Sequence, residues 1–276
     1  SILCSEVAHV ETDECGAPEF FSNASGILLV PGEGGKLDPA GVERMVKKRT
    51  DIHYPKPRVV SLTQATEVGT VYSLAEIQAI ATIAKSHGLP LHMDGARFAN
   101  ALVSLDATPA EMTWKGGVDI VSFGGTKNGA LGAEAIVLLN PDAVQAGPQG
   151  AGKTVEYLRK SSMQLASKMR FVSAQLVSLL TDELWLRSAR HANTMALRLA
   201  EGVRALDGVT LTQEPAANQV LAVLDPSVAD AVRSRYAFYD WDASRNEVRW
   251  MTSWDTTEDD VDGFTAALRS ALGAAE

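Results

Sequence analysis

The chain has 276 residues, of which 46% are hydrophobic and 21% are charged, and its formal net charge at pH 7 is −9. This composition is typical of a folded globular protein, and the negative balance argues against a nucleic-acid partner or an anionic membrane surface, since both attract clustered basic residues. No apolar run reaches the length of about 18 residues that a membrane-spanning helix needs.

Short apolar runs alternate with helical patterns in the first half of the chain. The chain opens as if inside a strand, and further strands are expected at Gly26–Val30, Arg58–Thr63, Leu89–Met93, Asp119–Phe123 and Glu134–Leu139. Helices are expected at Pro39–Arg49, Leu74–His87 and around Arg97–Val103, and the glycine-rich stretch Gly147–Gly152 closes this half. The alternation predicts an open α/β sheet with mainly parallel strands, because short right-handed connections bring successive strands together in one direction.

The pattern changes at about Thr154. Two long helical stretches are expected at Thr154–Leu180 and Asp182–Leu206. They are followed by strands at Val209–Thr212, Gln219–Leu224 and Glu247–Met251 and by helices at Ser227–Arg235 and Thr257–Leu272. This mixed order favours a smaller α+β domain. We therefore expect a large domain over residues 1–153, a linking long helix over 154–190 and a small C-terminal domain over 191–276.

The cysteines and histidines favour neither a disulfide framework nor a metal site. Cys4 and Cys15 are the only two cysteines, and the sequence shows no secretion signal. We therefore expect reduced thiols and a cytoplasmic protein. The five histidines include no pair at the i, i+4 spacing of a helical metal site and lie near no cysteine cluster, so no bound metal is expected.

Two residues of complementary chemistry follow neighbouring predicted strands. Asp94 begins the segment Asp94-Gly95-Ala96-Arg97, and Lys127 lies in the glycine-rich segment Ser122–Gly129 after the next strand. Both side chains can face one pocket, because ligands of an open α/β sheet bind at the carboxyl ends of its strands. A Schiff-base lysine and a carboxylate for a pyridine nitrogen fit pyridoxal phosphate chemistry. Alternatively, Asp94 only caps the following helix and Lys127 is a solvated loop lysine.

The segments around these two residues resemble the threonine aldolase family, a group of fold-type-I pyridoxal-phosphate enzymes. The resemblance is carried by His92–Ala101 and Ser122–Gly129. Glu14–Phe21 and Thr63–Gly69 are especially similar to the low-specificity L-threonine aldolase and phenylserine aldolase branch. The resemblance extends from the first residues to about Asp262. It implies an aspartate aminotransferase-like large domain with a mainly parallel sheet and a smaller α+β C-terminal domain.

The resemblance implies catalytic roles for Lys127, His53 and His9. Lys127 would bind the cofactor, pyridoxal 5'-phosphate, as a Schiff base, and Asp94 would pair with its pyridine nitrogen. His9 would stack on the cofactor ring. His53 would lie near the substrate β-hydroxyl as the candidate base, because an imidazole titrates near working pH. Both histidines could instead be ordinary surface or half-buried residues.

Three arginines complete the implied site. Arg97, which would also contact the cofactor, and Arg249 would hold the substrate carboxylate, since a guanidinium binds carboxylates in a bidentate manner. Arg170 would contact the cofactor phosphate from across a subunit interface. Alternatively, Arg249 is a structural ion-pair partner, and Arg170 belongs to a solvated or interface face of a long helix.

These roles imply a lyase that cleaves a β-hydroxy-α-amino acid, such as threonine or phenylserine, to glycine and an aldehyde. Family members are homo-oligomers, so we expect a homodimer or homotetramer with a small amino-acid substrate. The first alternative is another fold-type-I lyase that eliminates a β-substituent. The two types of lyase differ in their products, which are glycine plus an aldehyde for the aldolase and pyruvate plus ammonia for the eliminating enzyme.

The second alternative is an inactive aldolase-like scaffold. A cofactor phosphate needs a cluster of backbone N–H donors, commonly a glycine-rich turn at a helix N-terminus. In the family this turn lies upstream of the residue that matches His9. Here only eight residues precede His9, and none of them is glycine. We therefore expect the N-terminal part of the large domain to be missing from this chain.

Overall fold

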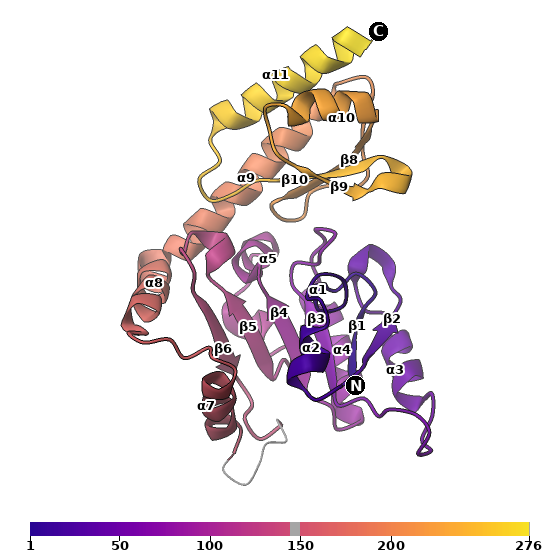
Figure 1. Ribbon diagram of the computed structural model, residues 1–276, viewed down its shortest axis with the longest axis vertical. Coiled ribbons are helices and arrows are strands. Elements are labelled where there is room, and N and C mark those ends of the chain that lie inside the picture. The colour runs from indigo at the N-terminus through magenta and orange to yellow at the C-terminus, as the bar shows by residue number, and fades with distance from the viewer. Residues whose placement is uncertain (144–149, 276) are drawn as a thin grey trace.

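A computed structural model describes residues 1–143 and 150–275. Positions 147–149 of the predicted glycine-rich closing stretch lie outside these ranges. The described chain forms two sheets, a six-stranded one built from its first half and a four-stranded one built from its last third (Figure 1). Each sheet has its own cluster of buried hydrophobic side chains.

The large sheet has the strand order β2-β1-β3-β4-β5-β6. Its strands are β1 (Ile2–Ser5), β2 (Ile27–Val30), β3 (Val59–Thr63), β4 (Leu91–Gly95), β5 (Ile120–Gly124) and β6 (Glu134–Leu138). All neighbouring pairs are parallel except β5 and β6, which are antiparallel. The mainly parallel sheet is thus confirmed. The last strand reverses because residues 125–133 are too few for a parallel crossover.

The helices of the first half are α1 (His9–Thr12), α2 (Ala17–Phe21), α3 (Pro39–Lys47), α4 (Leu74–Ser86), α5 (Phe98–Leu105) and α6 (Pro109–Met112). Helix α4 begins with a capping box, in which Ser73 Oγ accepts from Glu76 N and Glu76 Oε2 accepts from Ser73 N. It buries Ile77 and Ile80 in the core of the large sheet. The chain leaves α4 through Gly88 at φ +66°, a left-handed conformation that suits glycine.

The predicted helix Thr154–Leu180 is wrong in its middle. The chain forms α7 (Ala151–Ser161) and α8 (Arg170–Leu180), separated by a segment in which Met163 and Lys168 adopt positive φ. A left-handed residue ends a helix, so two short helices replace one long one. Helix α9 (Leu184–Arg204) then confirms the second stretch. The division of the chain at 154–190 stays a prediction.

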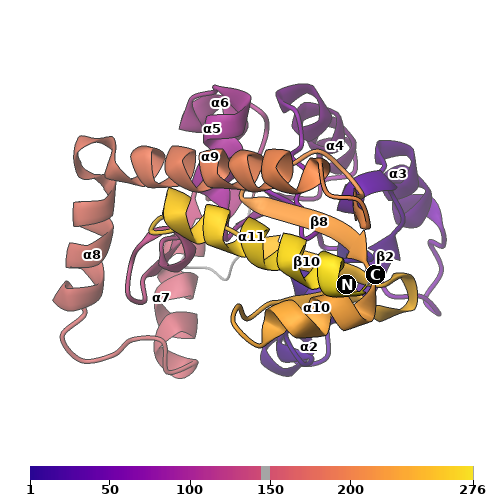
Figure 2. The ribbon, with the colours of Figure 1, turned by 90° about the horizontal axis from the view of Figure 1, so that it is seen from above.

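The small sheet has the order β7-β8-β10-β9, with β7 (Val209–Leu211), β8 (Gln219–Leu224), β9 (Tyr239–Asp242) and β10 (Glu247–Met251). All its pairings are antiparallel. Helices α9, α10 (Pro226–Arg233) and α11 (Glu258–Ala275) cover one side of it (Figures 1 and 2). Strand β9 escapes prediction because it is an edge strand whose first residue, Tyr239, is 76% exposed.

Helix α9 joins the two parts of the molecule. Near its middle, Asn193 exchanges two hydrogen bonds of 3.0 Å with Asn100 of α5, and farther along it buries Leu199 and Val203 beside the small sheet. Nearer its start it buries Trp185 and Ala189 in the core of the large sheet, so the same helix belongs to both hydrophobic cores. Among the helices of residues 1–143 and 150–275, none combines the length and apolarity needed to cross a bilayer.

Candidate active site

A cavity of about 690 Å³ extends along one face of the large sheet to the carboxyl ends of β3, β4 and β5. Four of the predicted site residues line it, namely His9, Asp94, Arg97 and Lys127. They come from three separate stretches of sequence, which the sheet order brings together. Side chains from adjacent strand ends thus meet in one place, as expected for an open α/β sheet.

Asp94 is positioned by the close approach of two chain segments at the end of β4. Its Oδ1 accepts a 2.9 Å hydrogen bond from Ala96 N, which fixes the carboxylate over the turn. A Cβ on Gly95 would lie 2.9 Å from the carbonyl oxygen of Ser122, and one on Gly124 would lie 2.7 Å from that of Ala96. Only glycine permits this contact. The glycines in the two sequence motifs therefore hold the turns after β4 and β5 together.

Lys127 lies in the 3₁₀ turn Thr126–Asn128 directly after β5. Both neighbours anchor this turn, since Thr126 Oγ1 accepts from Ala133 N and the buried Asn128 donates to the carbonyl oxygen of Trp185. Solvent reaches the lysine from the cavity, yet enough protein surrounds the amine that desolvation lowers its pKa, and the positive charge of Arg97 lowers it further. A larger share of Lys127 is therefore the nucleophilic neutral amine.

The small sheet adds a second arginine beside the cavity. Arg249 of β10 lies with its guanidinium 4.7 Å from the ring centroid of Trp241, and its buried Nε has no partner within the described structure. Burial lowers the pKa of Arg97, and the charge of Arg249 lowers it further. Two guanidiniums that repel each other favour an anionic ligand between them. This is the charge pattern expected for the carboxylate of an amino acid.

His9 is the first residue of α1 and is held at both its backbone and its ring. Its N–H donates to Glu67 Oε1 at 2.7 Å. Its ring nitrogens lie 3.2 Å from Glu14 Oε1 and 3.2 Å from Asp13 Oδ2. The imidazole is thus fixed at the wall of the cavity.

Three predicted residues lie outside the cavity lining, namely Arg249, His53 and Arg170. His53 is exposed in the loop after α3, where its backbone N–H donates to Asp51. Arg170 is exposed at the start of α8. Neither residue lines the cavity of this single chain. Their roles toward substrate and phosphate stay predictions.

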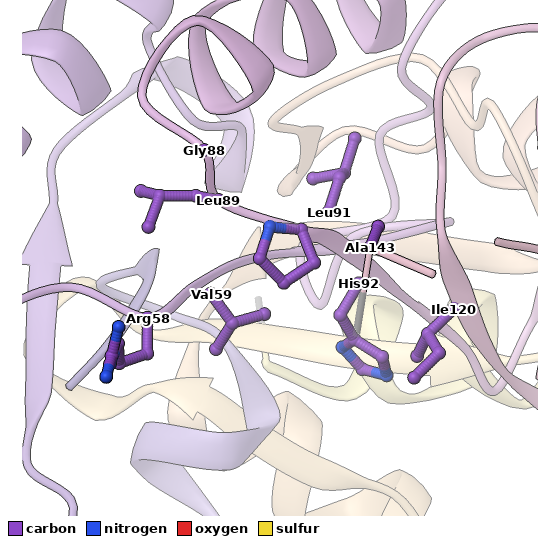
Figure 3. Close-up of a pocket in the computed structure, with 9 residues that line it drawn as sticks. Arg58, Val59, Gly88, Leu89, Leu91, His92, Ile120 and Ala143 are labelled. Atoms are coloured by element: carbon purple, nitrogen blue, oxygen red, sulfur yellow. The ribbon is translucent and has the colours of Figure 1, made fainter. Parts of the chain in front are cut away.

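The sequence did not lead us to expect a row of three hydrogen-bonded polar side chains next to the site, formed by Ser61, His92 and Ser122. His92 Nδ1 lies 2.8 Å from Ser61 Oγ, and its Nε2 lies 2.9 Å from Ser122 Oγ, so the imidazole bridges β3 and β5. It also borders a second cavity of about 370 Å³ toward the amino ends of the strands, beside Val59 and Ile120 (Figure 3). The two-residue period of a strand was the available signal, because it places His92 and Asp94 on one face.

Glu67 is the other residue that the sequence did not single out. It lines the cavity from the loop between β3 and α4, and its side chain is buried. No strand or helix period reaches this loop, so the sequence carried no signal for its orientation.

Comparison with known proteins agrees with this geometry. Residues 1–226 match the sequence model of the beta-eliminating lyase family. The low specificity L-threonine aldolase of Pseudomonas aeruginosa is 50% identical over 275 residues, which are 99% of this chain and 77% of that protein. The low specificity L-threonine aldolase of Saccharomyces cerevisiae is 38% identical over 102 residues, which are 37% of this chain and 26% of that protein.

Solved structures match the fold as a whole. The threonine aldolase of Leishmania major superimposes with a TM-score of 0.87 at 28% identity, over 99% of this chain and 77% of that one. The 4-hydroxyphenylacetaldehyde synthase of Rhodiola rosea reaches a TM-score of 0.70 at 18% identity, over 99% of this chain and 62% of that one, and shows the shared fold alone. The predicted fold-type-I architecture is thus confirmed. With its matched family model and its relative at 50% identity, the chain belongs to the threonine aldolase family.

Proposed function

We propose that this protein is a pyridoxal-phosphate-dependent aldolase that cleaves β-hydroxy-α-amino acids, such as L-threonine or phenylserine, to glycine and an aldehyde. The observation that carries this proposal is the convergence of Lys127 and Asp94 on one cavity with Arg97 beside them. Relatives of the same family bear the name L-threonine aldolase. The cavity and the family therefore support the same chemistry.

The chemistry of the cavity residues fits the cofactor. Lys127 offers an amine of lowered pKa for the aldehyde group, and Asp94 offers a carboxylate for the pyridine nitrogen. His9 offers a flat ring at the cavity wall. When bound, pyridoxal phosphate supplies an electron sink for the electron pair of a breaking bond to Cα.

The chain's own residues would select which bond breaks. Arg97 and Arg249 would hold the substrate carboxylate, so that the amino acid binds in one orientation with its Cα–Cβ bond aligned for cleavage. Asp94 would keep the pyridine nitrogen protonated by a charge-assisted hydrogen bond. Removing the β-hydroxyl proton requires a base, and His53 stays the family-implied candidate.

The decisive test is the substitution Lys127→Ala. We expect the protein to lose the absorbance of lysine-bound cofactor and to lose threonine cleavage, which is measured as glycine and acetaldehyde formed. Lys115→Ala is the matched control, because Lys115 is exposed and lies outside the cavity. Cleavage by Lys127→Ala at the wild-type rate would refute the assignment.

A second reaction deserves comparison because the matched family model is that of beta-eliminating lyases. Such an enzyme would use the same Lys127 and Asp94 to eliminate a β-leaving group, and it would release pyruvate and ammonia from L-serine or 2-oxobutanoate and ammonia from L-threonine. Product analysis separates the two activities, since an aldolase instead forms glycine with formaldehyde from L-serine or with acetaldehyde from L-threonine. A chain that develops no absorbance with pyridoxal phosphate would instead support the inactive scaffold.

We also propose that the protein works in the cytoplasm as a homodimer or homotetramer. Exposed apolar side chains support association, since Tyr157 of α7 and Phe171 and Val177 of α8 are each more than 60% exposed. Arg170 begins the same helix α8 and would reach the cofactor phosphate of a paired subunit. The free thiols of Cys4 and Cys15 support a reducing compartment. Sedimentation equilibrium measures the assembly, and a monomer would contradict it.

A further inference from the structure

Glu67 is a buried carboxyl group that the proposed chemistry leaves without a role. Its residue is only 7% exposed, and it lines the cavity that holds Asp94 and Lys127. One oxygen, Oε1, accepts the N–H of His9 at 2.7 Å. The other, Oε2, is buried and has no hydrogen-bond partner in the part of the chain that the structure describes. A buried polar atom of this kind is costly unless a ligand supplies the partner.

The loop that carries Glu67 is held firmly at both ends. The side-chain amide of Gln64 pairs with the backbone of Tyr72 through two hydrogen bonds of 2.9 Å. From the small sheet, Gln219 Nε2 donates to the carbonyl oxygen of Glu67 at 3.0 Å. Gly69 at φ +80° packs against the side chain of Gln219. The position of the carboxyl group is therefore set by the fold rather than by a mobile loop.

The surroundings of Glu67 favour its protonated form. Burial raises the pKa of the carboxyl group, and the charge of Asp94 adds to this, whereas the His9 N–H and the Thr63 hydroxyl oppose it. His9 and Lys127 line the same cavity, and the charge of Glu67 also acts on Arg97, on Cys4 of β1 and on Tyr72. Burial raises the pKa of the Cys4 thiol to about 12, and the charges of Glu11 and Glu67 add to this shift. Burial also raises the pKa of Tyr72, to which the charges of Glu67 and Glu76 add. Neither group therefore supplies a charge near neutral pH.

We propose that Glu67 is an acid–base residue of the active site, whose free oxygen Oε2 hydrogen-bonds a hydroxyl group of the bound ligand. The inference rests on the aldolase function proposed above. Two hydroxyls fit the same chemistry, the ring hydroxyl of the cofactor and the β-hydroxyl of the substrate. A carboxyl group can donate to either while protonated and accept from either while ionised.

The first experiment uses the cofactor-free protein. Glutamate labelled with ¹³C at the carboxyl carbon is titrated by NMR, and the Glu67 signal is identified by its loss in Glu67→Gln. Glu201→Gln on the exposed face of α9 is the control that removes an ordinary surface signal. We expect the Glu67 signal to titrate at clearly higher pH than the surface signals. Titration together with them would overturn the inference, whatever the protein catalyses.

The second experiment measures binding of pyridoxal phosphate and of its analogue without the ring hydroxyl. If Glu67 contacts that hydroxyl, Glu67→Ala weakens binding of pyridoxal phosphate roughly tenfold and leaves binding of the analogue unchanged. If it contacts the substrate, cofactor binding is unchanged, while kcat/KM for L-threonine falls roughly 100-fold and glycine binding persists. In either case Glu67→Gln, which keeps the shape, retains the fold.

Unchanged cofactor binding together with unchanged kcat/KM in a folded Glu67→Ala protein would overturn the inference and leave the aldolase proposal intact. Failure of the wild-type chain to bind pyridoxal phosphate would instead remove the proposed function, and with it the ligand that this inference requires. The wild-type and variant measurements thus separate the two failures.

Discussion

The two sheets of this protein differ in the kind of side chain that they bring together. The small sheet packs aromatic rings, with Trp250 and Phe264 at 5.2 Å and Tyr236 and Phe264 also at 5.2 Å between ring centroids. The carboxyl ends of the large sheet instead hold charged groups around a cavity. The antiparallel sheet therefore contributes mainly burial, whereas the ends of the parallel strands contribute chemistry.

At the junction between the two sheets, several buried polar atoms lack a hydrogen-bond partner, and this lowers stability. Four side chains there keep a buried polar atom without a partner in the described structure, namely Glu67, Asn218, Gln219 and Arg249. Each such atom costs about 1–3 kcal/mol when no ligand satisfies it. Of these four, Glu67 lines the cavity, so its unused hydrogen-bonding capacity suits the binding of a polar ligand there. Substitutions in the two regions should therefore separate effects on stability from effects on chemistry.

The largest expected effect is at the chemical end of the large sheet. Asp94→Asn keeps an oxygen that can accept from Ala96 N, but it loses the charge that would hold the pyridine nitrogen protonated. We expect kcat/KM for L-threonine to fall about 10³-fold, with the unfolding midpoint nearly unchanged. Steady-state kinetics and thermal unfolding provide the check. An activity within tenfold of wild type would show that Asp94 only caps the turn.

A substitution in the aromatic cluster beside the small sheet, formed by Tyr236, Phe238, Trp250 and Phe264, should lower stability rather than remove the chemistry. Phe264→Ala removes a ring that contacts Trp250, Tyr236 and Phe238. We expect a loss of about 3–4 kcal/mol in the free energy of unfolding, because a large cavity remains. Denaturant titration measures this loss, and Phe20→Ala, at an 80% exposed position, is the control. Equal losses in both variants would contradict the assignment of the cluster to stability.

Arg249 belongs to the small sheet, but its charge acts on Lys127 of the large-sheet cavity. Its substitution should therefore change both substrate binding and the pKa of Lys127. Arg249→Met removes a positive charge that lowers the pKa of Lys127. The amine then stays protonated to higher pH, so cofactor capture at a fixed pH below that pKa should slow, and KM should rise about tenfold. Arg249→Lys keeps the charge but not the planar fork, so it should raise KM alone. Stopped-flow absorbance at several pH values distinguishes these results, and identical profiles for both variants would refute the electrostatic argument.

The pH dependence of folding gives a further, smaller effect. Because the pKa of Glu67 is raised in the folded state, the folded protein binds more protons than the unfolded chain at pH values between the two pKa values. The stabilisation from this group is therefore full below the unfolded pKa of about 4.3 and is lost as the pH rises through the folded pKa. Glu67→Gln should flatten this fall. The free energy of unfolding of both proteins is measured by denaturant titration at several pH values. Equal slopes of this free energy against pH would contradict the contribution of Glu67.

Regular periodicity explains how much of the fold was predictable. The strand runs before Asp94 and Lys127 contain buried apolar residues at regular positions, so their ends and their shared edge followed from the sequence. Resemblance then supplied roles for His9 and Arg97, which the cavity brings together. Positive φ at Met163 could not be predicted, because the surrounding residues continue a helical pattern.

The remaining site residues depend on contacts that no local pattern encodes. The orientation of Glu67 follows from hydrogen bonds to His9 and Gln219, which lie 58 and 152 positions away along the chain. Arg249 reaches the site only through the placement of the small sheet. His53 and Arg170 face solvent in the single chain, so a test of their roles requires the assembled protein.

The smallest expected effect is a purely local one at the start of α4. Ser73→Ala removes the hydroxyl that accepts from Glu76 N in the capping box, and this loss should cost about 1 kcal/mol of stability. Catalytic constants should stay at wild-type values, because none of the residues of α4 lines the cavity. Thr108→Ala, which removes the capping box of α6, is the matched comparison. A large loss of activity in either variant would mean that these helix starts are coupled to the site, and stability and chemistry would then not separate.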